Sequence, residues 1–228
     1  MAESVSDIVL SLADCKQLLG LRYAEWCSAT PTLEADIAAA AMGLDDLGHS
    51  RVLAGCLPEL GPDPRGQERE TDPGAYRNVA FLDDTWTDWN QFVAANAILD
   101  SAFTVMIEKL VEGDVEVLRT RLRKMLSEER YHFLHGRSWL REMGASPAVN
   151  QAWKEAFEWF GPDGGPLRAR LAAKLEQPEP GLDIDWSKWD PIRRRCLPGA
   201  IDQRTFDMLR GLEERRYGVV RAETPARG

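Results

Sequence analysis

The 228-residue chain is poor in cysteine and histidine and has no long apolar segment. Its four cysteines are scattered, without CxxC spacing or the density of a disulfide scaffold, so we expect reduced thiols in the core or near the surface. No stretch approaches the roughly 18 apolar residues that a membrane span needs. The N-terminus also lacks a basic segment ahead of an apolar run. We therefore expect a cytoplasmic location.

Basic residues are fewer than acidic residues. The chain has 28 Lys and Arg against 37 Asp and Glu, a net charge of -9, which disfavours nucleic acid or an anionic membrane surface as the main partner. The run of three arginines at 193–195 is a local exception that could meet the phosphates of a CoA carrier or an acidic partner. Adjacent arginines most often form a solvated patch, and this is the arrangement we expect here.

What the chain does have is Ala, Leu, Glu and Arg in helical patterns rather than β-branched residues. Apolar spacing and capping signals predict helices at about 5–27, 33–57, 86–112, 114–143, 148–160 and 202–217. Residues 58–84 are rich in Pro, Gly and charge, which predicts a long connection across the outside of the bundle. A single all-α domain, 1–228, of the ferritin-like four-helix type follows, with the bundle at about 5–143 and a C-terminal extension at about 148–217. The tail 223–228 should be disordered.

The three histidines are His49, His132 and His135, and two of them follow an acid by three residues. The pairs are Asp46 with His49 and Glu129 with His132. On a helix, residues i and i+3 share a face, so each pair can offer a carboxylate and an imidazole to one point. Two such pairs on facing helices form half of a di-iron or di-manganese carboxylate site.

The other two bundle helices should each supply a carboxylate. Asp100 lies in the middle of the predicted third helix among apolar residues, where a lone buried charge would be costly. In the first helix the inward position is occupied by Lys16. The nearby acids Asp14 and Glu25 lie about 200° and 180° around that helix, so neither replaces a ligand at this position.

These segments resemble the phenylacetic acid catabolic family, the ferritin-like A-type and C-type subunits of the bacterial phenylacetyl-CoA epoxidase. The resemblance covers about residues 10–160 and rests on ADCKQLLGLRYAEWC, TPTLEAD, MGLDDLGHSRVL, AILDSAF and SEERYHFLHGRSWLREMG. The AEWC, RYH and SWLREMG segments look most like the C-type subunit. That resemblance implies a structural role with a degraded metal site, holding the catalytic A-type subunit.

The A-type subunit implies iron, bound by a Glu, a Glu-x-x-His, an Asp and a second Glu-x-x-His. In this chain the first of these positions is Lys16, whose ammonium group cannot bind a metal unless it loses its proton. The second carboxylate is shortened from Glu to Asp, and C-type sequences tend to have Gln where this chain has His49. The metal ligands that the resemblance implies are Asp46, His49, Asp100, Glu129 and His132.

Three interpretations of this cluster follow. In the first, Lys16 stands in for a lost cation and neutralises three buried carboxylates. In the second, a working non-haem di-metal centre uses five protein ligands, with Lys16 beside it or donating a proton to reduced oxygen. A single-metal site on Asp46, His49, Glu129 and His132 is intermediate. His135 is either a neighbour of the ligands or an exposed helical residue.

The function predicted from the resemblance is a C-type-like subunit of a multicomponent oxygenase, a ring-1,2-epoxidase, acting on phenylacetyl-CoA or a similar aromatic acyl-CoA. Its partners would be a homologous catalytic ferritin-like subunit, or a second copy of this chain, and an external reductase. One alternative is a stand-alone non-haem di-iron oxygenase or oxidase, with manganese as the other candidate metal. Another is a non-catalytic metal or oxygen sensor. The eight tryptophans could line a pocket for an aromatic acyl group, but we expect them in the core.

Overall fold

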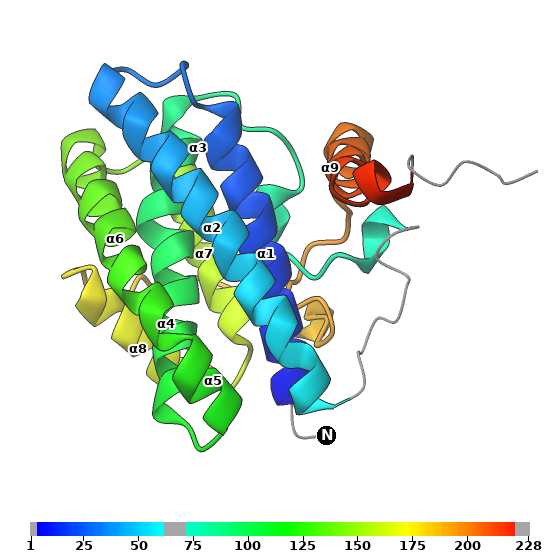
Figure 1. Cartoon of the computed structure of the whole chain (residues 1–228). Coiled ribbons are helices and arrows are strands. Elements are labelled where there is room, and N and C mark those ends of the chain that lie inside the picture. The colour runs from blue at the N-terminus through cyan, green and yellow to red at the C-terminus, as the bar shows by residue number, and fades with distance from the viewer. Residues whose placement is uncertain (1–3, 62–71, 222–228) are drawn as a thin grey trace, which may run out of the picture.

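The computed structural model describes residues 4–61 and 72–221, the segment 213–221 as backbone alone. This part of the chain is helical, with no strand and one isolated bridge between Asp190 and Arg195 (Figure 1). The predicted all-α bundle with additional C-terminal helices is confirmed. No helix within the described ranges is long and apolar enough to cross a membrane. The predicted disordered tail, 223–228, lies outside the described residues.

The first two bundle helices, α1 (Val5–Glu25) and α2 (Leu33–Leu60), lie side by side (Figure 1). Their close approach depends on two glycines, because a Cβ added at Gly20 would lie 2.9 Å from the carbonyl oxygen of Gly43. The Thr32 side chain caps α2 by accepting a hydrogen bond from the Ala35 amide. The predicted end at residue 57 was too early, since Pro58 lies within the helix.

The third bundle helix is built from α3 (Trp89–Ala94), a π-helical turn η4 (Ala95–Leu99) and α4 (Asp100–Glu112). Asp88 starts it with a capping box that also involves Gln91. We predicted one regular α-helix here, and the π turn is a correction. It ends immediately before Asp100, and insertions of this kind are frequent at functional sites.

The fourth bundle helix is also divided. The predicted single helix is α5 (Glu116–Arg121) followed by α6 (Arg123–Met143), with the break at Leu122. Gly136 lets α6 pack closely on the π turn, because a Cβ at this position would lie 2.8 Å from the backbone of Ala97. Gly136 therefore brings α6 close to the π turn that precedes Asp100.

The connection between α2 and α3 does not stay on the outside of the bundle as we predicted. Its described part contains two 3-10 turns, η2 (Pro73–Ala75) and η3 (Ala80–Leu82), and contributes buried side chains to the core. Those side chains are Tyr76, Val79, Phe81, Leu82 and Trp86. The segment therefore forms part of the hydrophobic core.

The C-terminal part contains α7 (Pro147–Phe160), α8 (Gly165–Lys174), a 3-10 turn η5 (Trp186–Lys188) and α9 (Gln203–Arg221). We predicted α7 and α9 but not α8. In α7, Trp159 packs against Phe103 of α4 with ring centroids 4.9 Å apart, which supports the expected core role of tryptophan. Buried Arg22 of α1 donates to the Thr205 hydroxyl at 2.9 Å and so connects α9 to the bundle.

The arginine run at 193–195 is not the solvated patch that we predicted. Arg194 and Arg195 are buried. Arg195 pairs with Asp83 at 2.9 Å, and Arg194 donates from Nε to the Trp159 carbonyl oxygen at 2.7 Å. The run therefore fixes the C-terminal segment to α7 and to the connection before α3.

Candidate functional site

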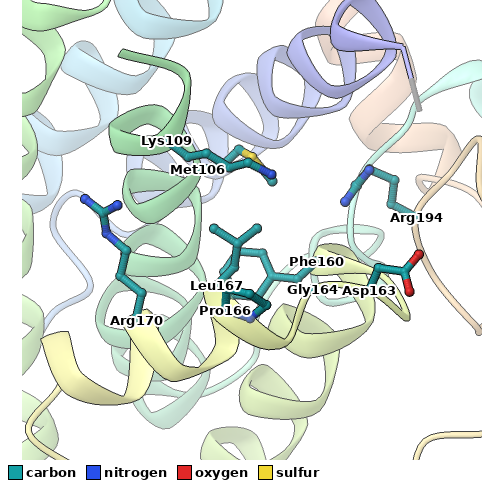
Figure 2. Close-up of a pocket in the computed structure, with 9 residues that line it drawn as sticks. All are labelled: Met106, Lys109, Phe160, Asp163, Gly164, Pro166, Leu167, Arg170 and Arg194. Atoms are coloured by element: carbon teal, nitrogen blue, oxygen red, sulfur yellow. The ribbon is translucent and has the colours of Figure 1, made fainter. Parts of the chain in front are cut away.

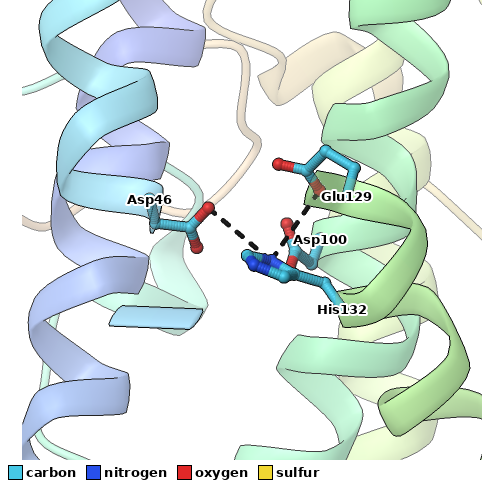
Figure 3. A group of neighbouring side chains, drawn as sticks. All are labelled: Asp46, Asp100, Glu129 and His132. Carbon is cyan, nitrogen blue, oxygen red and sulfur yellow. Dashed lines mark hydrogen bonds and ion pairs between the residues drawn. The ribbon is translucent and has the colours of Figure 1, made fainter. Parts of the chain in front are cut away.

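The candidate site is a buried cluster to which each bundle helix contributes. Lys16 comes from α1, Asp46 from α2, Asp100 from α4, and Glu129 with His132 from α6. Each of these residues is at most 2% exposed. Figure 3 shows the two aspartates, the glutamate and His132 pointing toward one another. One potential ligand atom from each of these four lies within 4.8 Å of the others, so the group could hold a metal ion.

The centre of the cluster is taken up by the ammonium group of Lys16. Its Nζ donates to Asp46 Oδ1 at 2.8 Å and also to Asp100 Oδ1 and Glu129 Oε1. An ammonium group has three N–H donors, so each finds a carboxylate oxygen. Burial alone would lower the pKa of Lys16, but the carboxylates outweigh it and hold that pKa well above its usual value.

The two histidines complete the charge distribution. His49 Nδ1 lies 2.9 Å from Glu129 Oε1, and His132 Nδ1 lies 3.0 Å from Asp100 Oδ2. Burial alone would lower both imidazole pKa values. The hydrogen bonds to the carboxylates outweigh burial and raise the pKa to about 10 for His49 and about 9 for His132. Both rings are therefore doubly protonated and positively charged at neutral pH.

Three basic groups face three buried carboxylates in this cluster: Lys16, His49 and His132 against Asp46, Asp100 and Glu129. Two partly exposed carboxylates also approach the histidines from the edge of the cluster, Glu128 at His49 and Asp45 at His132. Burial alone would raise the pKa of Glu129, yet Lys16 and the histidines hold it well below its usual value. A buried set of charges is tolerated when each has a partner at hydrogen-bond distance, as here.

Three further residues contact the cluster and were not predicted. The Tyr23 hydroxyl donates to Asp100 Oδ2 at 3.3 Å, and the Thr104 hydroxyl donates to Glu129 Oε2 at 2.8 Å. Their spacing could have revealed them, since Tyr23 is seven residues after Lys16 and Thr104 four after Asp100.

The third of these residues, Glu128, binds His49 Nε2 at 2.8 Å. Its side chain is 30% exposed, so it connects the cluster to the surface between α2 and α6. No spacing signal identifies Glu128, because adjacent residues lie about 100° apart around a helix and Glu128 directly precedes Glu129.

His135 was predicted to be either a neighbour of the metal ligands or an exposed helical residue, and neither description fits it fully. It is half-buried, and its Nδ1 lies 2.9 Å from Asn96 Oδ1, whereas the Asn96 amide donates to the His132 carbonyl oxygen at 3.2 Å. Burial and the neighbouring His132 lower the pKa of His135 to about 4, so it is neutral at pH 7. It supports the π turn rather than the charged cluster.

The residues present do not fit a two-metal centre. Lys16 holds three of the carboxylate oxygens that a metal would need, and its high pKa opposes the loss of the blocking proton. Neither nearby acid on α1 replaces it: Asp14 accepts from the Arg77 amide at 3.0 Å, and Glu25 pairs with Arg22. His49 also lies outside the four-residue group that could hold an ion. Metal binding by these residues stays a prediction.

Comparison with known proteins matches most of this chain, including the charged cluster, to one protein family. A family model described as phenylacetic acid catabolic protein matches residues 2–188, a span that includes every residue of the cluster. The chain belongs to this family. The match confirms the resemblance to this family that the sequence motifs indicated.

A curated relative agrees with the C-type resemblance. The chain is 28% identical over 167 residues to the C subunit of the 1,2-phenylacetyl-CoA epoxidase of Escherichia coli (strain K12). The match covers 68% of this chain and 66% of the relative, so the chain spans just under two thirds of that protein's length. The C-type segments quoted from the sequence are therefore consistent with the named relative.

Proposed function

We propose that this chain is a non-catalytic, C-type subunit of a multicomponent oxygenase that acts on phenylacetyl-CoA or a similar aromatic acyl-CoA. The observation that carries this proposal is the position of Lys16, whose ammonium group binds the oxygens of Asp46, Asp100 and Glu129 together. A protein whose candidate ligands are neutralised by its own lysine does not need a metal to keep its bundle folded. The names of the family and of the relative support the proposed reaction and substrate class.

In this proposal the oxygen chemistry belongs to the complex. A homologous ferritin-like subunit would carry the di-iron centre, and an external reductase would supply its electrons. This chain would contribute a rigid, single-domain bundle, with the charged cluster connecting its four helices. Its location would be cytoplasmic, where acyl-CoA substrates occur.

A stripe of exposed apolar residues on α2 is the surface we assign to the partner. Leu33, Ile37 and Leu44 are 70%, 63% and 71% exposed and lie within about 40° of one another around the helix. Tyr131 and Leu134 add exposed apolar area on α6. Exposed apolar side chains that share one helix face are typical of protein–protein contacts. We call the residues on α2 the α2 stripe.

Co-purification with the catalytic homologue tests the proposal. We expect the two chains to form a complex that oxidises phenylacetyl-CoA with O2 and a reductase, and neither chain to do so alone. Substituting both Ile37 and Leu44 in the α2 stripe by Glu should abolish the complex, because charge would enter an apolar interface. Leu197→Glu is the matched control, since Leu197 is 48% exposed and outside the α2 stripe. Turnover by this chain alone would contradict the proposal.

One observation favours a second candidate. The ligand atoms of Asp46, Asp100, Glu129 and His132 converge within 4.8 Å, so an ion could bind if Lys16 left the cluster. The chain would then be a stand-alone metal-dependent oxygenase or oxidase, or a metal or oxygen sensor without turnover. We rank this second because the high pKa of Lys16 opposes its departure.

A further inference from the structure

A cavity of about 390 Å³ lies apart from the charged cluster, between α4, the end of α7, the start of α8 and the turn at 190–195. Three buried apolar side chains form much of its wall: Met106, Phe160 and Leu167. Figure 2 shows Lys109 and Arg194 entering from opposite sides, with their nitrogen ends facing each other across the cavity. The volume is within the range of small-molecule sites.

The position of Arg194 is built by the turn that carries it. The Arg194 amide donates to the Asp190 carbonyl oxygen at 2.7 Å, and Arg194 has a left-handed backbone conformation with φ of 55°. A non-glycine residue in this conformation is strained, so the surrounding structure must hold it in place. The guanidinium is 1% exposed, lies 5.4 Å from the Trp159 ring centroid and donates through Nε to the Trp159 carbonyl oxygen. The side chain is thus fixed at the wall of the cavity.

The charges around the cavity are mainly positive. Of its three cations, Arg170 is bound by Glu108 and Glu112 at 2.8–2.9 Å, whereas Lys109 is exposed at the mouth. One carboxylate, Asp163, is also part of the lining and is exposed at the rim. Two cations that face each other across an apolar space attract an anion that can lie between them. Burial also lowers the pKa of Arg194, to about 10.

We propose that this cavity binds an amphipathic monocarboxylate, a small aromatic or medium-chain acid, whose carboxylate lies between Arg194 and Lys109. Its apolar body would pack against Met106, Phe160 and Leu167. The cavity offers guanidinium and ammonium donors for the head group and apolar surface for the rest, and it is too small for a macromolecular segment with side chains. The site is separate from the charged cluster, and the proposal is independent of the oxygenase function.

Octanoate is the probe, and octanamide is its uncharged counterpart of the same length. Calorimetric titration of the full chain should give 1:1 saturable binding of octanoate, at least about tenfold tighter than octanamide. Lys109→Glu should weaken octanoate binding by tenfold or more without affecting the fold, because Lys109 is exposed. Lys188→Glu is the matched control on another surface and should leave the affinity unchanged.

A second variant tests the cavity itself. Leu167→Trp should fill the space and abolish binding, and its circular dichroism and unfolding midpoint show whether the chain still folds. Equal affinity for octanoate and octanamide, no saturable binding at millimolar octanoate, or unchanged binding in Lys109→Glu would each overturn the proposal.

Discussion

Replacing Lys16 by Met tests how much the central ammonium group stabilises the fold. Met keeps most of the volume of the lysine stem but removes the charge, so two protonated histidines would face three carboxylates in a buried site. The least costly response is protonation of one carboxylate. For an Asp whose pKa in the unfolded chain is 3.8, this costs about 4 kcal/mol at pH 7, since each pH unit is worth about 1.4 kcal/mol. Burial already raises the pKa of Asp100, so Asp100 is the carboxylate expected to take up the proton. The value agrees with the ~3–5 kcal/mol typical of removing one partner of a buried ion pair.

The same reasoning gives the pH dependence of the loss. Once a carboxylate has a folded-state pKa raised above its unfolded value, its protonated form stabilises the fold at low pH and the stability is lost as pH rises. The deficit of Lys16→Met should therefore shrink to about 2 kcal/mol at pH 5.5. Urea unfolding at both pH values measures it, with Lys109→Met as the exposed-lysine control, expected within about 0.5 kcal/mol of wild type. A Lys16→Met chain as stable as wild type at pH 7, or a loss independent of pH, would refute this reasoning.

Two further predictions concern the histidines and the packing of α6. The pKa values of His49 and His132 are raised in the folded state to about 10 and about 9 from an ordinary 6.5, so their stabilisation is complete below about pH 6.5 and lost as pH rises. The free energy of unfolding should fall by about 2 kcal/mol or more between pH 6.5 and 9, and a flat profile in urea unfolding would contradict the assignment. Gly136→Ala should cost about 1–3 kcal/mol, because its Cβ would meet the Ala97 backbone at 2.8 Å. Gly48→Ala, on an open helix face, should be neutral or stabilising, and similar melting temperatures for the two variants would show that the contact is not restrictive.

The sequence was sufficient to predict the bundle and the members of its cluster. Pairs at i and i+3 placed Asp46 and Glu129 with their histidines, and an isolated acid among apolar residues identified Asp100. Lys16 was recognisable because a charge lay on the apolar face of its helix. All these signals depend on spacing within one helix. They predicted the positions correctly because spacing along a regular helix determines which residues share a face.

Features that depend on contacts between distant segments could not be predicted in this way. The π turn before Asp100 lies where α6 approaches closely at Gly136, and nothing in residues 95–99 alone indicates it. The burial of Arg194 follows from a turn that forms only when the C-terminal segment packs on α7. Glu128 reaches His49 across two helices, so helical spacing within α6 could not reveal it.

A lysine in the place of a metal ion keeps a positive charge at the centre of the bundle. Lys16 offers three donors at a point surrounded by oxygen atoms from three helices. Its charge can hold those helices together at any metal concentration. Under the proposed function, Lys16 is the residue that would distinguish this chain from a metal-binding subunit of the same fold.

Lys16 is proposed to fill the place of a metal ion, and the metal content of the purified protein tests this proposal. Iron and manganese would be measured per chain after expression in iron-replete medium, for wild type, Lys16→Glu and His49→Ala. We expect little metal in wild type and His49→Ala, and uptake in Lys16→Glu, where a carboxylate replaces the ammonium group. About two metals per wild-type chain, lost in His49→Ala, would contradict this proposal and show a working di-metal site.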